Sequence, residues 1–577
     1  MNQRSLPGGG GNGWGATAAG TAAFGLFYFI FAWQPGVLRS DDFGYLRSIL
    51  GTLERGHPYT YEWLAPYGAT FSSACALLYR LTGNFYASTY GFQALCSLLV
   101  YALLQRLLVR RVASWHAALL SAAFACGPIC FAKVADFHGG IPTLALTLTA
   151  LLCFGAANAW GFFLAAFLAF ANRQSHIALL LMPAWSAASH AWARTGRAPR
   201  VSPPTPDQAL AFAGPKAAAF AVAFVAAAFF LHSRMNLTYA MANAVFTDSG
   251  HGRIISMVLA ALAGIFITIF LLALCGAVFL PPAGTLRANL RRPALPLAAS
   301  AVLLAMRFVW PPGLVLTDTP MFGWFDWEAV NSALPWILLA GIWFADFRLL
   351  RPSPSLAAIA GFIGIASLRG VWWDYYFLEI AVLCLVIAAG GAEASVGAKP
   401  ARLSLPVLVG LAMLLSAETG YAWLLRIQMD KQAIAVRTLE KLERSGAARV
   451  DRMTGATFGY AGWKLFDHFL AHDGKAYGQL ADFQGYIRKD LIKVETGLPW
   501  RRAFKAPLPP GAELLDSGTC MVGFARVPFR VADWHGPDSS VPAMGRPMRL
   551  DPKSFRSPRF PLTNREWDTW IASPAGR

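Results

Sequence analysis

Charged residues are scarce in this sequence. They make up 14% of its 577 residues, whereas a soluble globular protein carries about a quarter. The shortage lies in residues 1 to about 424, which contain long apolar runs, while the remaining tail has an ordinary soluble composition. The sequence therefore predicts a polytopic membrane protein with a soluble C-terminal tail.

Motifs for nucleotide and metal chemistry are also lacking. The chain has no P-loop, no dinucleotide-binding glycine pattern between a strand and a helix, no nucleophile elbow and no paired-histidine metal motif. ATP-driven coupling within this chain is therefore not expected. Much of the net charge of +18 falls in short loops between apolar runs, which indicates membrane topology rather than nucleic-acid binding.

Cysteine use excludes a disulfide framework as the organising feature. Seven of the eight cysteines lie in or beside apolar runs, and only Cys520 lies in the tail. Cys126 and Cys130 would share a helix face, but no histidine or carboxylate accompanies them at ligand spacing. Small buried apolar residues are the better interpretation.

Apolar runs predict about thirteen transmembrane helices and thus an all-α membrane domain. The runs are 15–33, 85–105, 117–132, 140–157, 160–171, 177–192, 217–232, 254–279, 295–309, 331–346, 353–368, 373–391 and 403–424.

The positive-inside rule supports this topology. With a cytoplasmic N-terminus, every sizeable loop on the inner side is basic, as in Arg110-Arg111 and Arg291-Arg292. The predicted organisation is a cytoplasmic N-terminal tail (1–14), a transmembrane domain (15–424) with a first outer loop at 34–84, and an outer soluble α/β domain (425–577).

Acidic residues concentrate on the predicted outer face, beginning with RSDDFGYL at 39–46. Adjacent carboxylates point in different directions on a helix, so one of Asp41 and Asp42 would face a reaction centre. A partly buried carboxylate has a raised pKa and accepts protons better near neutral pH. The alternative is a solvated pair that caps the next helix.

Other polar residues join the pair on this face. Asp136 stands at the junction of the third and fourth spans, with His138 beside it, and carboxylates near membrane depth are often functional. An arginine among aromatic residues at an interface binds a lipid phosphate or belongs to the ordinary interfacial belt. Candidates of these kinds are Arg369, Arg173, Arg307, His176, Glu62, Trp373, Asp374 and Tyr375, and Glu379 stands inside the helix that follows.

The layout resembles the GT-C superfamily of integral membrane glycosyltransferases, in the branch of the protein O-mannosyltransferases and the lipid A aminoarabinose transferases. The resemblance rests on Ser40-Asp41-Asp42-Phe43-Gly44-Tyr45 in the first outer loop, Ala135-Asp136-Phe137 at the third junction, and the basic-aromatic stretch from Arg369 to Phe377. It covers about residues 15–424. The segment before the sixth helix, ANRQSH, departs from the family, as does the lack of a Glu-Lys-Pro-Pro run near Glu62.

The resemblance implies a sugar donor linked to polyprenyl phosphate and an acceptor hydroxyl on an envelope lipid, polysaccharide or protein. Asp41 would act as general base, Asp42 would orient it or share the proton, and Asp136 would position the acceptor or hold a metal ion. Arg369, Arg173 and Arg307 would bind the donor phosphate. Glu62, His138, His176, Trp373, Asp374 and Tyr375 would contact substrate. The reaction would invert the anomeric centre.

Several alternatives stay open. One alternative is a transporter or flippase of a lipid-linked sugar, and another is a non-catalytic partner in polysaccharide assembly. No cofactor is required by the sequence, and a need for Mg²⁺, Mn²⁺ or Zn²⁺ is undecided. The Ala/Gly/Arg-rich, Lys-poor composition suggests a GC-rich bacterial genome, which would place the chain in the inner membrane with its basic tail in the periplasm.

Overall fold

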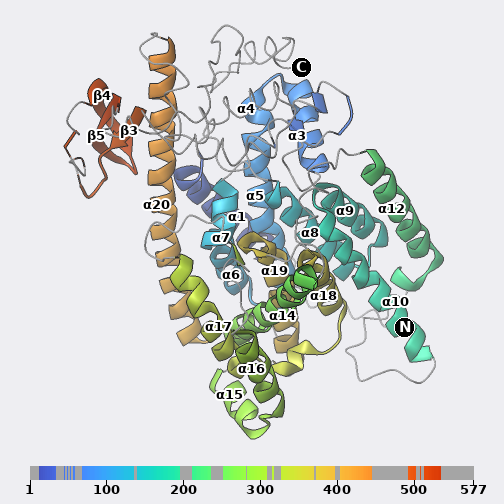
Figure 1. Cartoon of the computed structure of the whole chain (residues 1–577). Helices are drawn as coiled ribbons and strands as arrows, with labels where there is room; N and C mark the ends of the chain where they lie inside the picture. Colours follow the sequence, from blue (N-terminus) through green and yellow to red (C-terminus); the bar gives the residue numbers. More distant parts are fainter. Residues whose placement is uncertain are drawn as a thin grey trace.

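The fold is mostly helical, as the apolar runs predicted. Figure 1 shows the structure, a computed structural model of the whole chain. The structure describes residues 12–33, 45, 48–49, 52–53, 56–58, 68–135, 139–194, 211–234, 251–280, 282–307, 315–316, 327–368, 372–396, 403–444, 492–501, 504, 507–508 and 512–533.

The helices pack side by side around one continuous apolar core. In the first half of the chain they are α1 (Asn12–Phe31), α3 (Ala69–Thr82), α4 (Phe85–Ser88), α5 (Tyr90–Leu108), α6 (Ser114–Cys126), α7 (Pro128–Ala135), α8 (Gly140–Gly155), α9 (Ala159–Asn172), η1 (Gln174–Leu180), α10 (Leu181–Arg194), α12 (Pro215–Arg234) and α14 (His251–Phe279). The later ones are α15 (Pro282–Arg291), α16 (Ala294–Arg307), α17 (Trp327–Phe344), η2 (Phe347–Leu350), α18 (Pro354–Ser367), η3 (Asp374–Tyr376), α19 (Phe377–Val396) and α20 (Leu405–Arg444).

Each of the thirteen apolar runs falls on a helix or a pair of helices, but their lengths differ. Four described helices are long and apolar enough to cross a membrane, namely α1, α5, α14 and α20, and a fifth span exists if the bent pair α6–α7 is counted as one. Seven other apolar helices have 10–17 residues, whereas about 20 are needed to cross the hydrocarbon core. Helix length therefore supports a multi-pass membrane protein with four or five spans, and the count of thirteen remains a prediction.

Three features of the helices differ from the sequence expectation. The first outer loop contains the helix α3, in which Ser72 is buried among apolar residues and Arg80 is exposed. The run at 117–132 is broken by a 66° bend between α6 and α7, where Gly127 precedes Pro128 and a proline cannot continue the preceding helix. The predicted domain boundary at 424/425 lies inside α20, which continues to Arg444 without a break.

The two ends of the helical bundle can be told apart by contacts between α1, α5 and α20. At the start of α1, the guanidinium carbon of Arg106 lies 3.8 Å from the centre of the Trp14 ring. At the other end of α1, Arg426 in α20 donates hydrogen bonds to the carbonyls of Ile30 at 3.1 Å and Trp33 at 3.2 Å. We call the end where α1 finishes the tail end, and the end where α1 begins the opposite end.

A small antiparallel sheet lies beside α20 at the tail end (Figure 1). Its strands are β3 (Ile492–Thr496), β4 (Glu513–Val522) and β5 (Ala525–Asp533), in the order β3-β5-β4. The hairpin between β4 and β5 turns through Gly523 and Phe524, both at positive φ, which is the backbone of a type I′ turn. The Phe524 ring packs edge-on against Phe31, 6.0 Å away, and so holds the strained turn against α1.

The sheet is fixed to α20 by apolar and polar contacts. Ile427 and Ile434 of α20 form one buried cluster with Val522 and Val527. The carboxylate of Asp430 accepts a hydrogen bond from the Gly523 amide at 2.9 Å. The strands confirm that the predicted tail contains β structure, while residues 445–491 of that tail lie outside the described residues.

Candidate functional site

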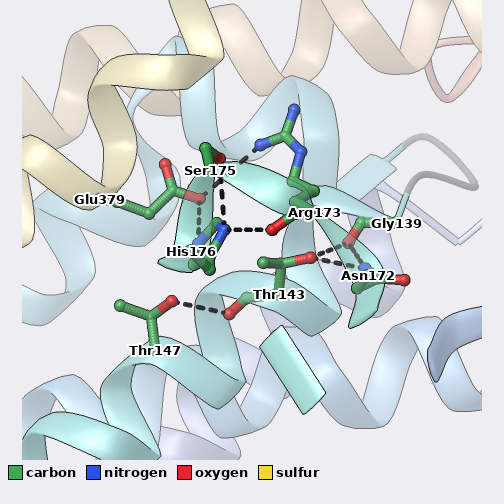
Figure 2. Close-up of polar contacts among 8 residues, drawn as sticks. All are labelled: Gly139, Thr143, Thr147, Asn172, Arg173, Ser175, His176 and Glu379. Atoms are coloured by element: carbon green, nitrogen blue, oxygen red, sulfur yellow. Dashed lines mark hydrogen bonds and ion pairs between the residues drawn. The ribbon is translucent and has the colours of Figure 1, made fainter. Parts of the chain in front are cut away.

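Four chain segments that are distant in sequence meet at the tail end of the bundle. They are the start of α3, the end of α7 with the following Gly139, the junction of α9 with η1, and the start of α19. Gln93 at the start of α5 donates a hydrogen bond to the Lys133 carbonyl at 3.2 Å. The end of α5 lies at the start of α1 through Arg106 and Trp14, so the start of α5, and with it this meeting point, lies near the finish of α1. The polar cluster there is drawn in Figure 2.

Asn172 joins three of these segments. Its amide nitrogen donates to the Gly139 carbonyl at 2.6 Å and to the Thr143 hydroxyl at 2.5 Å, and its side-chain oxygen accepts from the Phe71 amide at 3.2 Å (Figure 2 shows the first two). Its own carbonyl accepts from the Gly68 amide at 2.9 Å. Because buried polar groups are stable only when they are paired, these bonds fix where the first outer loop joins the bundle.

Two glycines allow the close approach of these segments. Gly68 has a φ of +60°, a conformation that favours glycine, and it begins α3. A methyl group on Gly139 would lie 2.8 Å from the ring of Tyr45 and 3.3 Å from the Asn172 amide. The first outer loop and the junction before α8 are therefore in direct contact through Tyr45 and Gly139.

The charged part of the cluster consists of Arg173, His176 and Glu379 (Figure 2). One guanidinium nitrogen of Arg173 lies 3.7 Å from the Glu379 carboxylate, and His176 Nε2 lies 3.4 Å from the same carboxylate oxygen. These are ion-pair distances rather than short hydrogen bonds. The other ring nitrogen of His176 faces the Arg173 carbonyl at 3.2 Å. All three side chains are buried.

Aromatic rings surround the cations of the cluster. The Arg173 guanidinium carbon is 4.7 Å from the centre of the Tyr375 ring and 5.2 Å from that of Tyr376. The Lys133 ammonium nitrogen is 4.8 Å from the centre of the same Tyr375 ring. Two cations from separate segments thus converge on one tyrosine, and Lys133 is only 1% exposed.

This arrangement is suited to binding an anion. Arg173 and Lys133 bring two positive charges to the same tyrosine ring, and the Glu379 carboxylate lies against Arg173. An anionic ligand between these cations would be held by charge-assisted hydrogen bonds, and a planar guanidinium suits phosphate oxygens well.

Contacts behind the cluster set the position of His176. Its ring packs edge-on against Phe362 in α18, with 5.1 Å between ring centres. One turn of α18 approaches η1 closely at Gly361, where an added methyl group would lie 2.9 Å from the Ala178 methyl. The seven-residue η1 therefore holds His176 between α18 and α19.

The structure brings together only some of the residues that the sequence predicted. Arg173, His176 and Tyr375 lie in the cluster. Arg307 ends α16. Trp373 lies in the strand β2 (Trp372–Trp373), which pairs in parallel with β1 (Val315–Leu316), and Asp374 begins η3. The side chains of these three residues are not described. Outside the described residues lie Asp41, Asp42, Glu62, Asp136, His138 and Arg369.

The chain matches no protein-family model, no curated protein and no solved structure. Membership of the GT-C superfamily is therefore not shown.

The sequence did not predict that three further residues, which form the core of the cluster, lie together. Lys133 is the one ionisable residue of the helix PICFAKVA, Asn172 ends the apolar helix α9, and Glu379 stands in the first turn of α19. The sequence did single out Glu379, and a lone charged residue in an apolar run is the signal that could have found Lys133. The pairing itself could not be found, because the partners are on different helices.

The described residues contain no group of three or more histidine, cysteine, aspartate or glutamate side chains that could hold a metal ion. Asp136, which was proposed to position the acceptor or hold a metal ion, lies outside them. The need for Mg²⁺, Mn²⁺ or Zn²⁺ therefore stays undecided.

Proposed function

We propose that this chain is a glycosyltransferase of GT-C type, with about thirteen transmembrane helices. It transfers a sugar from a polyprenyl-phosphate donor to a hydroxyl of an envelope lipid, polysaccharide or protein. The reaction takes place at the tail end of the bundle, which faces the periplasm of a bacterial inner membrane. The observation that carries the proposal is the convergence of Arg173 and Lys133 on Tyr375.

The donor explains why cations would be buried at this place. A polyprenyl chain stays in the bilayer while its phosphate reaches the membrane surface, so the protein needs a phosphate site at the edge of the helical bundle. Arg173 and Lys133 supply charge there, and Glu379 holds Arg173 in position. As the sugar leaves, the phosphate gains negative charge, and fixed cations stabilise that charge most in a site that excludes water.

The acidic residues proposed for catalysis precede the contact between Tyr45 and Gly139 in the sequence. Asp42 stands three residues before Tyr45, and Asp136 stands three residues before Gly139. Tyr45 and Gly139 touch, so described residues that follow the two acidic stretches in the sequence meet beside the cationic cluster. This supports an acidic and a cationic group acting on one substrate.

The reaction that we propose is a single displacement. The acceptor oxygen attacks the anomeric carbon and gives its proton to the Asp41 carboxylate, while Asp42 orients that carboxylate. The bond between the anomeric carbon and the phosphate oxygen breaks, and its electron pair leaves on the phosphate, which Arg173 and Lys133 bind with Arg369. Attack from the side opposite the phosphate inverts the anomeric centre. Asp136 would position the acceptor.

Charge at the opposite end supports the proposed orientation. Arginines gather there at the end of α5, along α15 and around η2, where they include Arg106, Arg110, Arg111, Arg287, Arg291, Arg292, Arg348 and Arg351. Basic loops stay in the cytoplasm during membrane insertion. The tail end, with the sheet and the cluster, would then face the periplasm.

The test is sugar transfer in proteoliposomes that contain pooled polyprenyl-phosphate sugars and native envelope acceptors. Asp41→Asn and Asp42→Asn are compared with the unmodified chain at equal amounts of folded protein. Loss of a general base lowers the rate by about 10²- to 10⁴-fold, so at least one variant should be nearly inactive. Normal transfer by both variants would rule out a catalytic role for the pair.

One observation favours a second candidate, a transporter or flippase of a lipid-linked sugar. Glu418 lies near the middle of the candidate span Leu405–Ala435, is 3% exposed, and has a carboxylate oxygen without a hydrogen-bond partner. Ionisable groups at such depth are typical of transport pathways. Movement of a labelled lipid-linked sugar between leaflets without any acceptor product, abolished by Glu418→Gln, would favour transport over transfer.

A further inference from the structure

A cavity of about 520 Å³ lies at the opposite end of the bundle, away from the polar cluster. It is formed by the ends of α5 and α8, by η2 with the start of α18, and by the second half of α19. None of its lining residues belongs to the cluster at the tail end. The cavity is therefore a separate feature of the fold.

The rim of the cavity is strongly cationic. Four arginines line it, Arg110, Arg111, Arg348 and Arg351, against the single carboxylate of Asp346. Asp346 is already paired with Arg348, whose guanidinium nitrogen lies 2.8 Å from its oxygen. This gives the described lining an excess of three positive charges at the cavity mouth, which attracts an anion.

Two glycines make room for the guanidinium groups. A methyl group on Gly155 would lie 3.1 Å from a guanidinium nitrogen of Arg110, and one on Gly390 would lie 3.0 Å from that of Arg111. Arg111 also donates a hydrogen bond to the Val386 carbonyl at 2.5 Å. The arginines thus lie against the helix backbones at the cavity edge, with Arg111 held in a fixed place.

The inner wall of the same cavity is apolar. It is formed by side chains from five chain segments, namely Leu107, Leu151, Phe154, Leu280, Leu349 and Ile387. The start of α18 also opens on the cavity, with Ser353 as its N-cap, and the positive end of a helix dipole adds to the attraction for anions. A cationic rim above an apolar wall matches a molecule with an anionic head and an apolar body.

We propose that this cavity binds the phosphate group of an anionic membrane lipid. The arginines hold the phosphate, and the upper parts of the acyl chains lie along the apolar wall. Basic pockets between transmembrane helices are suited to lipid head groups of this kind. The lipid would contact α5, α8, α18 and α19 at the opposite end of the bundle. This assignment does not depend on the glycosyltransferase proposal.

The experiment is native mass spectrometry of the full chain in detergent, titrated with phosphatidylglycerol, with phosphatidylcholine, or with glycerol 1-phosphate. Arg110→Gln/Arg351→Gln is the test variant, because both side chains are exposed and neither is needed to hold Arg111. Arg291→Gln/Arg292→Gln removes the same charge from α15 and the residue after it, outside the cavity. Thermal unfolding is measured for each protein to show that it is folded.

The unmodified chain and the α15 control should retain phosphatidylglycerol in preference to phosphatidylcholine. Removal of two arginines should weaken phosphatidylglycerol binding by about 30-fold. Equal binding by the test variant and the unmodified chain would overturn the proposal, as would equal loss in the control. Binding of glycerol 1-phosphate as tight as that of the lipid would show a soluble phosphate ligand and refute the lipid assignment.

Discussion

A guanidinium nitrogen of Arg173 lies 3.7 Å from the carboxylate of Glu379, inside the protein, between two segments that the sequence keeps far apart. Arg173 stands between α9 and η1, and Glu379 stands in the first turn of α19. Removing one member of a buried ion pair leaves the other charge without compensation, which costs about 3–5 kcal/mol. The pair therefore links the two halves of the cluster energetically as well as in space.

The first prediction concerns this coupling. Arg173→Gln and Glu379→Gln should each lower the free energy of unfolding by about 3 kcal/mol, and the double variant should lose less than the sum by about 1–3 kcal/mol. The measurement is a double-mutant cycle on unfolding in detergent. The pair of Arg348 with Asp346 serves as control, because Arg348 is 73% exposed and such pairs contribute about 0–1 kcal/mol. Additive losses for Arg173 and Glu379 would show that the pair is not coupled.

The second prediction uses two glycines of α18. Gly361→Ala should destabilise the fold by about 1–3 kcal/mol, because its methyl group would lie 3.2 Å from the Ala178 backbone. Gly364→Ala meets nothing within 4 Å and should be neutral or stabilising by up to about 1 kcal/mol. The shift of thermal unfolding measures both. If the two variants behave alike, α18 does not approach η1 as described.

The third prediction concerns the attachment of the sheet to α20. Asp430→Ala removes the acceptor of the Gly523 amide and of the Arg426 side chain, so the sheet should detach more readily, at a cost of about 1–3 kcal/mol. Limited proteolysis should then cut residues 492–533 faster. Lys441→Ala is the control from the same interface. Its salt bridge to Asp516 is exposed, and cleavage should hardly change.

The fourth prediction is a pH dependence at Asp346. Burial raises the pKa of this carboxyl, but hydrogen bonds from Arg348 and the charges of Arg348 and Arg351 outweigh burial and lower it overall. A lowered pKa in the folded state gives stability that is complete above the pKa of an exposed aspartate and is lost as the pH falls through the lowered value. Asp346→Asn should therefore be less stable at neutral pH and approach the unmodified chain in acid. A stability difference that stays constant with pH would contradict this origin.

Helices were easy to predict from this sequence because each is built from a nearly uninterrupted apolar run. The residues FITIFLLALCGAVF at the end of α14 leave no other interpretation. The bend at Gly127 and the helix α3 were missed for opposite reasons. Hydropathy averages over a local break, and it underrates a short helix such as α3, whose apolar sequence is interrupted by serines and Arg80.

The candidate site could be predicted only in part. The sequence singled out Arg173, His176 and Tyr375 as polar or aromatic residues at the ends of apolar runs, and these do lie together. Their contacts with Lys133 and Glu379 depend on how helices pack against each other, which is decided by the shapes of many side chains at once. A single sequence does not contain that pairing in readable form.

The measurement that tests the central claim most directly is sugar transfer by purified chain in liposomes with labelled polyprenyl-phosphate sugars. The Arg173→Gln variant is compared with Arg291→Gln, which removes the same charge at the opposite end of the bundle. We expect label to move from the lipid donor to an acceptor hydroxyl, a loss of about 10²-fold or more in Arg173→Gln, and full activity in Arg291→Gln. Transfer that is unchanged in Arg173→Gln, or no transfer from any donor by the unmodified chain, would contradict the account.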